Sequence, residues 1–155
     1  RNWDGEQVAT VSGYDPHTGM ITLASPIDKP ITLADSSDFA IEVASLTRRV
    51  IFEADSDATH DAVGGHFIVH HTSAHQHIEG VEIRNFGQQG ILGKYPLHFH
   101  MCGDNPSTVK KNVVRDSNQR CYVIHMTNNV TLEDNVALMP SDIATFLKRG
   151  QRLVI

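Results

Sequence analysis

The sequence predicts an all-β protein whose central part is a parallel β-helix. From Gly64 onward, short apolar runs are separated by Gly, Asn and Asp, and each run is too short for a helix. A weak repeat accompanies these runs, because the motif Asn-Val returns after 23 residues, at Asn112 and at Asn135. Repeats of about 20 to 50 residues indicate a solenoid, and short strands with Asn at the turns indicate a parallel β-helix.

Histidines follow a similar repeat. The interval is 23 residues from His77 to His100 and 25 residues from His100 to His125. In a β-helix, equivalent residues of successive turns stack at a spacing of about 4.8 Å. The sequence therefore predicts a ladder of His77, His100 and His125 on one face.

The first residues predict a β-hairpin. The run Gln7–Val11 alternates, Tyr14–Gly19 has the composition of a turn, and Met20–Leu23 returns. Near the other end, Ser141–Gly150 has an N-cap candidate, an early acid, late bases and a terminal Gly, which predict a short helix that caps the solenoid. The acidic stretch Glu53–Asp61 is predicted to be a loop.

These elements divide the chain into three predicted parts. Residues 1–38 form an N-terminal β segment that contains the hairpin. Residues 39–138 form the coils of the β-helix. Residues 139–155 form a tail that departs from the repeat.

The segment Lys94–Asp104 carries the clearest functional signal. His98 and His100 are separated by Phe99, so on a β-strand both imidazoles lie on one face and the apolar residues lie on the other. Imidazole is a common metal ligand and acid–base group. We therefore expect this strand face to be a site.

The charge pattern excludes some partners and favours others. The formal net charge of −5 argues against a general nucleic-acid binder, and no apolar run is long enough to cross a membrane. Residues 84–120 are nevertheless basic, with six Lys or Arg and two acids, so an anionic ligand is expected there. Three residues are expected to bind it: Arg84, Lys94 and Arg115.

Two catalytic routes are open at the histidine strand. A glycoside hydrolase needs two carboxylates that flank the bond, and Asp104 is the first candidate. A lyase would instead use His98 or His100 as the base, with Arg120 or a cation to stabilise the developing negative charge. Two acids are candidates for the second carboxylate of a hydrolase: Glu79 and Asp116.

The histidines also predict a metal site. His98 and His100, with His66 or His125 from adjacent coils, would converge on one zinc ion, because Zn–N distances of about 2.0 Å suit imidazoles on neighbouring strands. The alternative is that the histidines only hydrogen-bond to one another or to water. Calcium prefers oxygen ligands and would be held by carboxylates instead.

The motif Gly93-Lys-Tyr-Pro-Leu-His-Phe-His100 is the most specific part of a wider resemblance. Further matching segments are Glu42–Arg49, Gly64–His66, His77–Glu82, Gly87–Gln89, Gly103–Asp104, Arg120–Cys121, Ile124–His125 and Asp134–Ala137. Together they resemble the β-helix region of the family that contains the cell-migration-inducing hyaluronan-binding protein, the cell-surface hyaluronidase and fibrocystin-L. The segment Gly5–Leu33 resembles the end of the eight-glycine domain that precedes this β-helix. After Leu138 the resemblance ends in this sequence.

The resemblance implies a right-handed β-helix in an extracellular or cell-surface protein. It implies an anionic polysaccharide such as hyaluronan as the partner and, for some relatives, calcium-dependent depolymerisation. The expected function is depolymerisation of hyaluronan, and the alternative is a non-catalytic glycan- or protein-binding module like that of fibrocystin-L. By resemblance, the positions of the expected site are His66, His98, His100, Asp104, Arg120 and His125.

Overall fold

The structure is a computed structural model that describes residues 7–29, 43–138 and 145–147. The chain divides into two compact units, residues 1–43 and residues 44–155. The sequence places the first boundary between residues 38 and 39.

The first unit contains the predicted hairpin. Strand β1 (Val11–Tyr14) pairs with β2 (Ile21–Leu23) in antiparallel register. The turn between them is fixed by Asp15, whose carboxylate accepts hydrogen bonds from the backbone N–H of His17 and the hydroxyl of Thr18, each at 2.8 Å. The hairpin is confirmed, but its first strand begins later than the alternating run Gln7–Val11 suggested.

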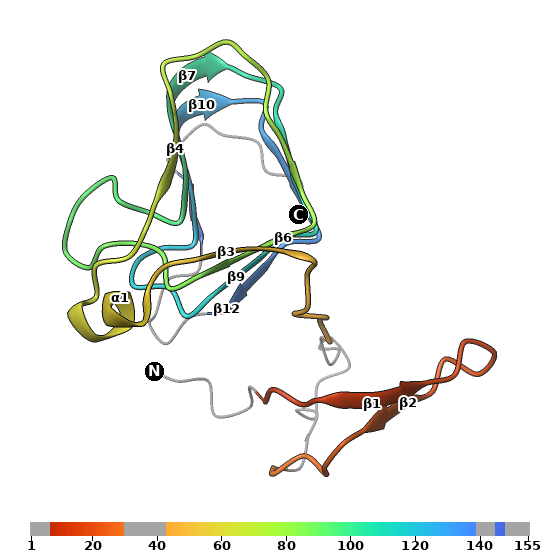
Figure 1. The fold of residues 1–155 in the computed structure, drawn as a ribbon. Coiled ribbons are helices and arrows are strands. Elements are labelled where there is room, and N and C mark those ends of the chain that lie inside the picture. Colours follow the sequence, from red (N-terminus) through yellow and green to blue (C-terminus); the bar gives the residue numbers. More distant parts are fainter. Residues whose placement is uncertain (1–6, 30–42, 139–144, 148–155) are drawn as a thin grey trace, which may run out of the picture. The chain divides into compact units, whose positions relative to one another are not determined.

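The second unit consists of three parallel sheets, and successive passes of the chain add one strand to each sheet in turn. Figure 1 looks along this stack, so the strands of one sheet overlap. This topology is consistent with a parallel β-helix. The first sheet holds β4 (Phe67–His70), β7 (Leu97–Asp104), β10 (Tyr122–Asn128) and β13 (Thr145–Leu147). The second holds β5 (His77–Glu79), β8 (Thr108–Lys110) and β11 (Thr131–Glu133). The third holds β3 (Val50–Glu53), β6 (Val81–Arg84), β9 (Val113–Arg115) and β12 (Val136–Leu138).

The corners between the sheets are made by single residues in the left-handed conformation. After the second-sheet strands β5, β8 and β11 these residues are Gly80, Lys111 and Asp134, with φ of 68°, 52° and 53°. A single left-handed residue turns the strand direction, and Gly, Asn and Asp adopt it with least strain. This is the physical origin of the turn residues that separate the apolar runs. The equivalent residues of the other corners are His71, Met101, Met126, Asn85 and Asp116.

The interior is lined by apolar side chains from all three sheets. The fully buried members include Phe99, Val109, Val114 and Ile124. Buried polar side chains also form hydrogen bonds between successive coils. The side-chain nitrogen Nδ2 of the buried Asn112 donates a hydrogen bond to Asn135 Oδ1 at 3.0 Å. The 23-residue spacing of these two asparagines is therefore a true coil repeat.

Two predicted elements differ in the structure. The middle of the predicted helix Ser141–Gly150 is strand β13, which pairs in parallel with β10. The remaining residues of that prediction lie outside the described residues. Pairing with the edge of an existing sheet here outweighs the weak local helix signal, because short helices gain little from propensity alone. The acidic stretch predicted as a loop contains the short helix α1 (Ser56–Asp61).

Candidate functional site

Strand β7 has the alternation predicted from its sequence. Leu97 and Phe99 are buried in the core cluster, and His98 and His100 lie on the opposite face of the strand. The alternation ends at Met101, which has a φ of 56° and begins the corner. The two imidazoles therefore belong to the outer face of the first sheet.

His98 is held from outside by the segment that precedes its strand. Its side chain is buried beneath that segment, its Nδ1 lies 3.1 Å from the backbone oxygen of Gly93, and its ring packs edge-on against Tyr95. A backbone oxygen can only accept, so Nδ1 carries the hydrogen and Nε2 keeps a free lone pair. The pKa of His98 is lowered to about 4, mainly by burial and also by the neighbouring histidines, while the hydrogen bond to Gly93 opposes this shift. The ring is therefore neutral at physiological pH.

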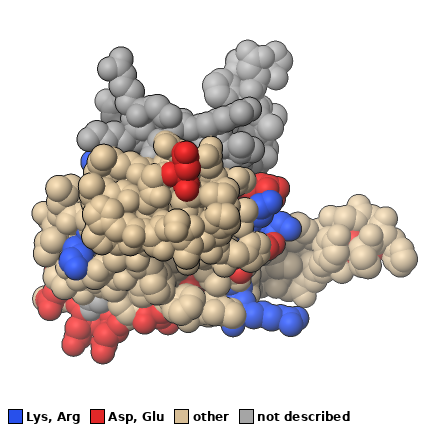
Figure 2. Space-filling model, turned by 90° about the horizontal axis from the view of Figure 1, so that it is seen from above, with Lys and Arg blue, Asp and Glu red and all other residues tan. Residues whose placement is uncertain are grey.

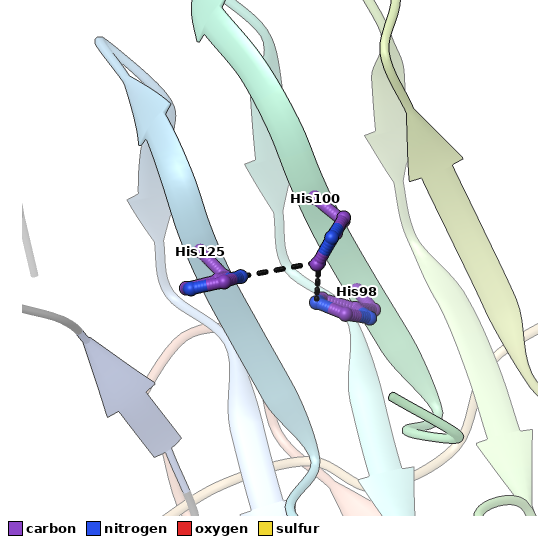
Figure 3. Close-up of side chains that lie close together, drawn as sticks. All are labelled: His98, His100 and His125. Carbon is purple, nitrogen blue, oxygen red and sulfur yellow. Dashed lines mark hydrogen bonds between the residues drawn. The ribbon is translucent and has the colours of Figure 1, made fainter. Parts of the chain in front are cut away.

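His100 and His125 are brought together by the strand register. Strand β10 pairs with β7 so that His125 lies opposite His100, and their ring centroids are 4.8 Å apart. His100 Nδ1 lies 3.3 Å from His98 Nε2 and 3.1 Å from His125 Nδ1 (Figure 3). One ligand nitrogen from each ring lies within 4.8 Å of the others. We call these three residues the histidine group.

The predicted histidine ladder is wrong in one member. His77 lies on β5 of the second sheet, where it stands in register with Thr108 and hydrogen-bonds to Thr108 Oγ1 and to Glu79. The residue in register with His100 on the preceding strand is His70, whose ring centroid is 5.2 Å away. The coils differ in length, since Thr108 follows His77 by 31 residues whereas Asn135 follows Asn112 by 23. A repeat of constant length therefore does not predict the position of His77 in the earlier coil.

His66 lies apart from the histidine group. It precedes β4, and its Nε2 is 3.0 Å from the Nζ of Lys94. Burial and the charge of Lys94 lower the pKa of His66, so its neutral ring accepts a hydrogen bond from the ammonium. Lys94, predicted to bind substrate, is thus engaged by a histidine that was predicted to bind metal.

The predicted catalytic residues Asp104 and Arg120 also lie outside the histidine group. Asp104 is exposed at the end of β7, where its Oδ1 accepts from the side-chain amides of Asn128 at 3.2 Å and Asn129 at 3.4 Å. Arg120 is partly buried and precedes β10 by two residues. Among the residues that the structure describes, the converging group thus consists of imidazoles and includes no carboxylate.

The other acids considered for a hydrolase are also engaged elsewhere. Glu79, on β5, lies 3.0 Å from the ring of His77. Asp116 follows β9 and pairs with Arg115 at 3.1 Å. Both acids lie on or directly after strands of other sheets than Asp104, which ends β7 of the first sheet, so neither is matched with Asp104 as the carboxylate pair that a hydrolase requires.

Arg84 and Arg115 are bound to a carboxylate that the sequence analysis did not single out. Each Nε lies 2.5 Å from Oε1 of Glu82, whose side chain is 1% exposed. Burial raises the pKa of Glu82, but the hydrogen bonds and charges of the two arginines lower it by more, so the carboxylate is ionised. The spacing Glu82-x-Arg84 on one strand could have indicated this pair, because alternate residues share a face.

Three imidazoles on one outer face can bind a transition metal, accept a proton, or form hydrogen bonds. They do not fit calcium, which takes oxygen ligands. Within the described residues, no other group of three or more His, Cys, Asp or Glu side chains converges in this way.

Three stacked parallel sheets with a histidine group on one outer face define an all-β protein with the topology of a β-helix. The family model described as the CEMIP β-helix matches residues 62–151. The chain therefore belongs to the CEMIP β-helix family, and the resemblance seen in the sequence is confirmed. The family match continues to residue 151, beyond Leu138, where the resemblance was expected to end.

Relatives are found in Dictyostelium discoideum and in Danio rerio. Protein rliB of Dictyostelium discoideum is 33% identical over 96% of this chain, and a G8 domain-containing protein of the same organism is 34% identical over 96%. The cell surface hyaluronidase of Danio rerio is 29% identical over 76%. The chain spans 14%, 14% and 10% of the length of these three relatives. No solved structure matches the chain.

Proposed function

We propose that the chain contributes a right-handed parallel β-helix to an extracellular or cell-surface protein that depolymerises an anionic polysaccharide of the hyaluronan type. The observation that carries the proposal is the convergence of His98, His100 and His125 on one outer sheet face, in a chain of the CEMIP β-helix family. The similarity to a cell surface hyaluronidase supports the choice of polysaccharide. Among the described residues, no helix is long and apolar enough to cross a membrane.

The chemistry favours the lyase route over a two-carboxylate hydrolase. A lyase needs a group that takes a proton from the uronate and a group that stabilises the developing negative charge. The histidine group supplies nitrogen lone pairs at one place, whereas Asp104, Glu79 and Asp116 each pair with different residues. We propose that Arg120 stabilises the charge, because it lies two residues before β10, a strand of the sheet that carries the histidine group.

The proposal is tested by the size of hyaluronan after incubation with the chain. High-molecular-weight hyaluronan should be shortened by the unaltered protein, as measured by size-exclusion chromatography with light scattering. His100→Ala should slow cleavage by about a hundredfold, the usual contribution of a positioned acid or base. His77→Ala is the matched control, since this exposed histidine lies on the second sheet, and it should cleave at the unaltered rate.

The products separate the two chemistries. A lyase leaves an unsaturated uronate with a new ultraviolet absorbance, and a hydrolase does not. Cleavage that is lost in Asp104→Asn but kept in His100→Ala would contradict the assignment to the histidine group. Binding of hyaluronan with no shortening would support the second candidate function, a non-catalytic binding module, which is consistent with Asp104, Glu79 and Asp116 each pairing with different residues.

A further inference from the structure

The three imidazoles of the histidine group meet nitrogen to nitrogen, as Figure 3 shows. His98 Nε2 and His125 Nδ1 both approach the same atom, His100 Nδ1, at 3.3 Å and 3.1 Å. We propose that the group is a binding site for one zinc ion, coordinated by His98 Nε2, His100 Nδ1 and His125 Nδ1. The site is argued from this geometry alone. With zinc bound, the coordinating ring nitrogens could not also act as the base of the proposed lyase route, and that role would pass to a metal-bound water.

Hydrogen bonds alone cannot account for both short contacts. The N–H of His98 is directed at the backbone oxygen of Gly93, so its Nε2 can only accept. His100 would then have to donate from Nδ1 to His98, and this single hydrogen is not available for the contact with His125. If His125 donates to His100 instead, the contact between His98 and His100 has no hydrogen. One cation that accepts a lone pair from each ring satisfies both contacts together.

The distances match those within a zinc coordination shell. Zinc binds imidazole nitrogen at about 2.0–2.1 Å in tetrahedral geometry, which places two ligand nitrogens about 3.3 Å apart. The two contacts to His100 Nδ1, at 3.3 Å and 3.1 Å, agree with this separation. The three ligand atoms lie within 4.8 Å of one another, so small rotations of the outer rings complete the shell.

The ligand set selects the class of metal. Neutral imidazoles suit zinc and neighbouring first-row ions, and they do not suit calcium or magnesium, which take oxygen. The bond from His98 to Gly93 is the kind of outer contact that fixes the tautomer and orientation of a metal-binding histidine. This ligand is therefore set in place by the backbone before any metal arrives.

The site keeps one position open. His98 is buried, whereas His100 and His125 are partly exposed, so solvent reaches the group from the outer face of the sheet. Three protein ligands with an open fourth position are typical of catalytic zinc rather than of structural zinc. A water molecule in that position would become more acidic and could act on a ligand at this face.

Zinc binding is measured by isothermal titration calorimetry on the full 155-residue chain. We expect one zinc ion per chain, no response to calcium, and binding weakened at least about tenfold in His100→Ala and in His125→Ala. The matched control is His70→Ala. This exposed histidine neighbours His100 on the same sheet but does not belong to the converging group, so its loss should leave the zinc affinity unchanged.

Cobalt provides a second readout that needs no variant. A tetrahedral nitrogen site should give the unaltered chain an intense visible cobalt spectrum, and zinc should remove it. A spectrum like that of hydrated cobalt would overturn the proposal. Equal weakening by His70→Ala and His125→Ala would overturn it as well. Neither measurement involves hyaluronan, so failure of the zinc site and failure of the proposed activity are separate results.

Discussion

Glu82 shows how one residue can determine the role of two others. Its Oε1 accepts hydrogen bonds from both Arg84 and Arg115, while Oε2 has no hydrogen-bond partner within the described residues. A buried carboxylate is stable only when it is paired, and removal of one partner from such a group is costly. The two arginines are therefore needed by the fold, which makes them poor candidates for a substrate that must come and go.

We expect Glu82→Gln to lower the free energy of unfolding by about 3 kcal/mol at neutral pH, because two guanidinium groups lose their buried counter-charge. The pKa of Glu82 in the folded chain lies below its ordinary value of 4.5. Its stabilisation is thus complete above that value and is lost as the pH falls through the folded pKa. Urea unfolding at several pH values should show the variant approaching the unaltered chain in acid.

The control for this pH series is Glu79→Gln, which alters an exposed acid on the neighbouring sheet. Its effect should stay within about 0.5 kcal/mol, as for most surface substitutions. A difference between Glu82→Gln and the unaltered chain that remained constant from pH 7 to pH 3 would contradict the ionised, arginine-paired state.

At the scale of the element, glycines are required for two different reasons. Gly64 is buried before β4, and a Cβ there would overlap the backbone carbonyl of Asn85. Gly80 forms a corner with a φ of 68°, and a Cβ there would meet nothing within 4 Å. One glycine permits close approach of two backbone segments, and the other permits a left-handed turn.

These reasons predict different costs. Gly64→Ala should lower the free energy of unfolding by about 3 kcal/mol, since two packed segments must separate. Gly80→Ala should cost only about 1 kcal/mol, because Lys111 and Asp134 already occupy equivalent corners as left-handed residues with side chains. Chemical denaturation of both variants checks the order, and equal losses would contradict it.

The elements also show what the sequence could predict. The alternation of Leu97 to His100 was readable because a strand with one buried face repeats every second residue. The position of His77 could not be predicted in this way, because it depends on the lengths of the connections between strands, which differ from coil to coil. Strand β13 and the pairing of Glu82 with Arg115 depend on register with distant strands, and no local pattern encodes that register.

At the scale of the whole molecule, several basic residues of the described part of the chain are paired with acids. Lys110 pairs with Glu133 at 2.5 Å, and Lys111 lies 3.9 Å from Glu79. Figure 2 shows the surface above β7 and β10, where most of the visible atoms belong to uncharged residues and the charged groups are scattered. With a formal net charge of −5, the chain has little long-range attraction for a polyanion.

The hyaluronan affinity should therefore depend only weakly on salt. A polyanion held by many free cations loses several orders of magnitude in affinity between 50 and 200 mM salt, because bound counterions are released on association. For this chain we expect a loss of less than about tenfold over the same range, since Arg84, Lys110 and Arg115 are paired with acids and contacts at the histidine group would be short in range. Glu133→Lys tests where the polysaccharide binds, because it removes the acid that pairs with Lys110 on the second sheet. If the polysaccharide lies on the first sheet, this variant should change neither the hyaluronan affinity nor the salt dependence of that affinity. Fluorescence anisotropy with labelled hyaluronan oligosaccharides measures both quantities, and a loss of more than a hundredfold in the unaltered chain would show that binding is driven by charge rather than by the histidine face.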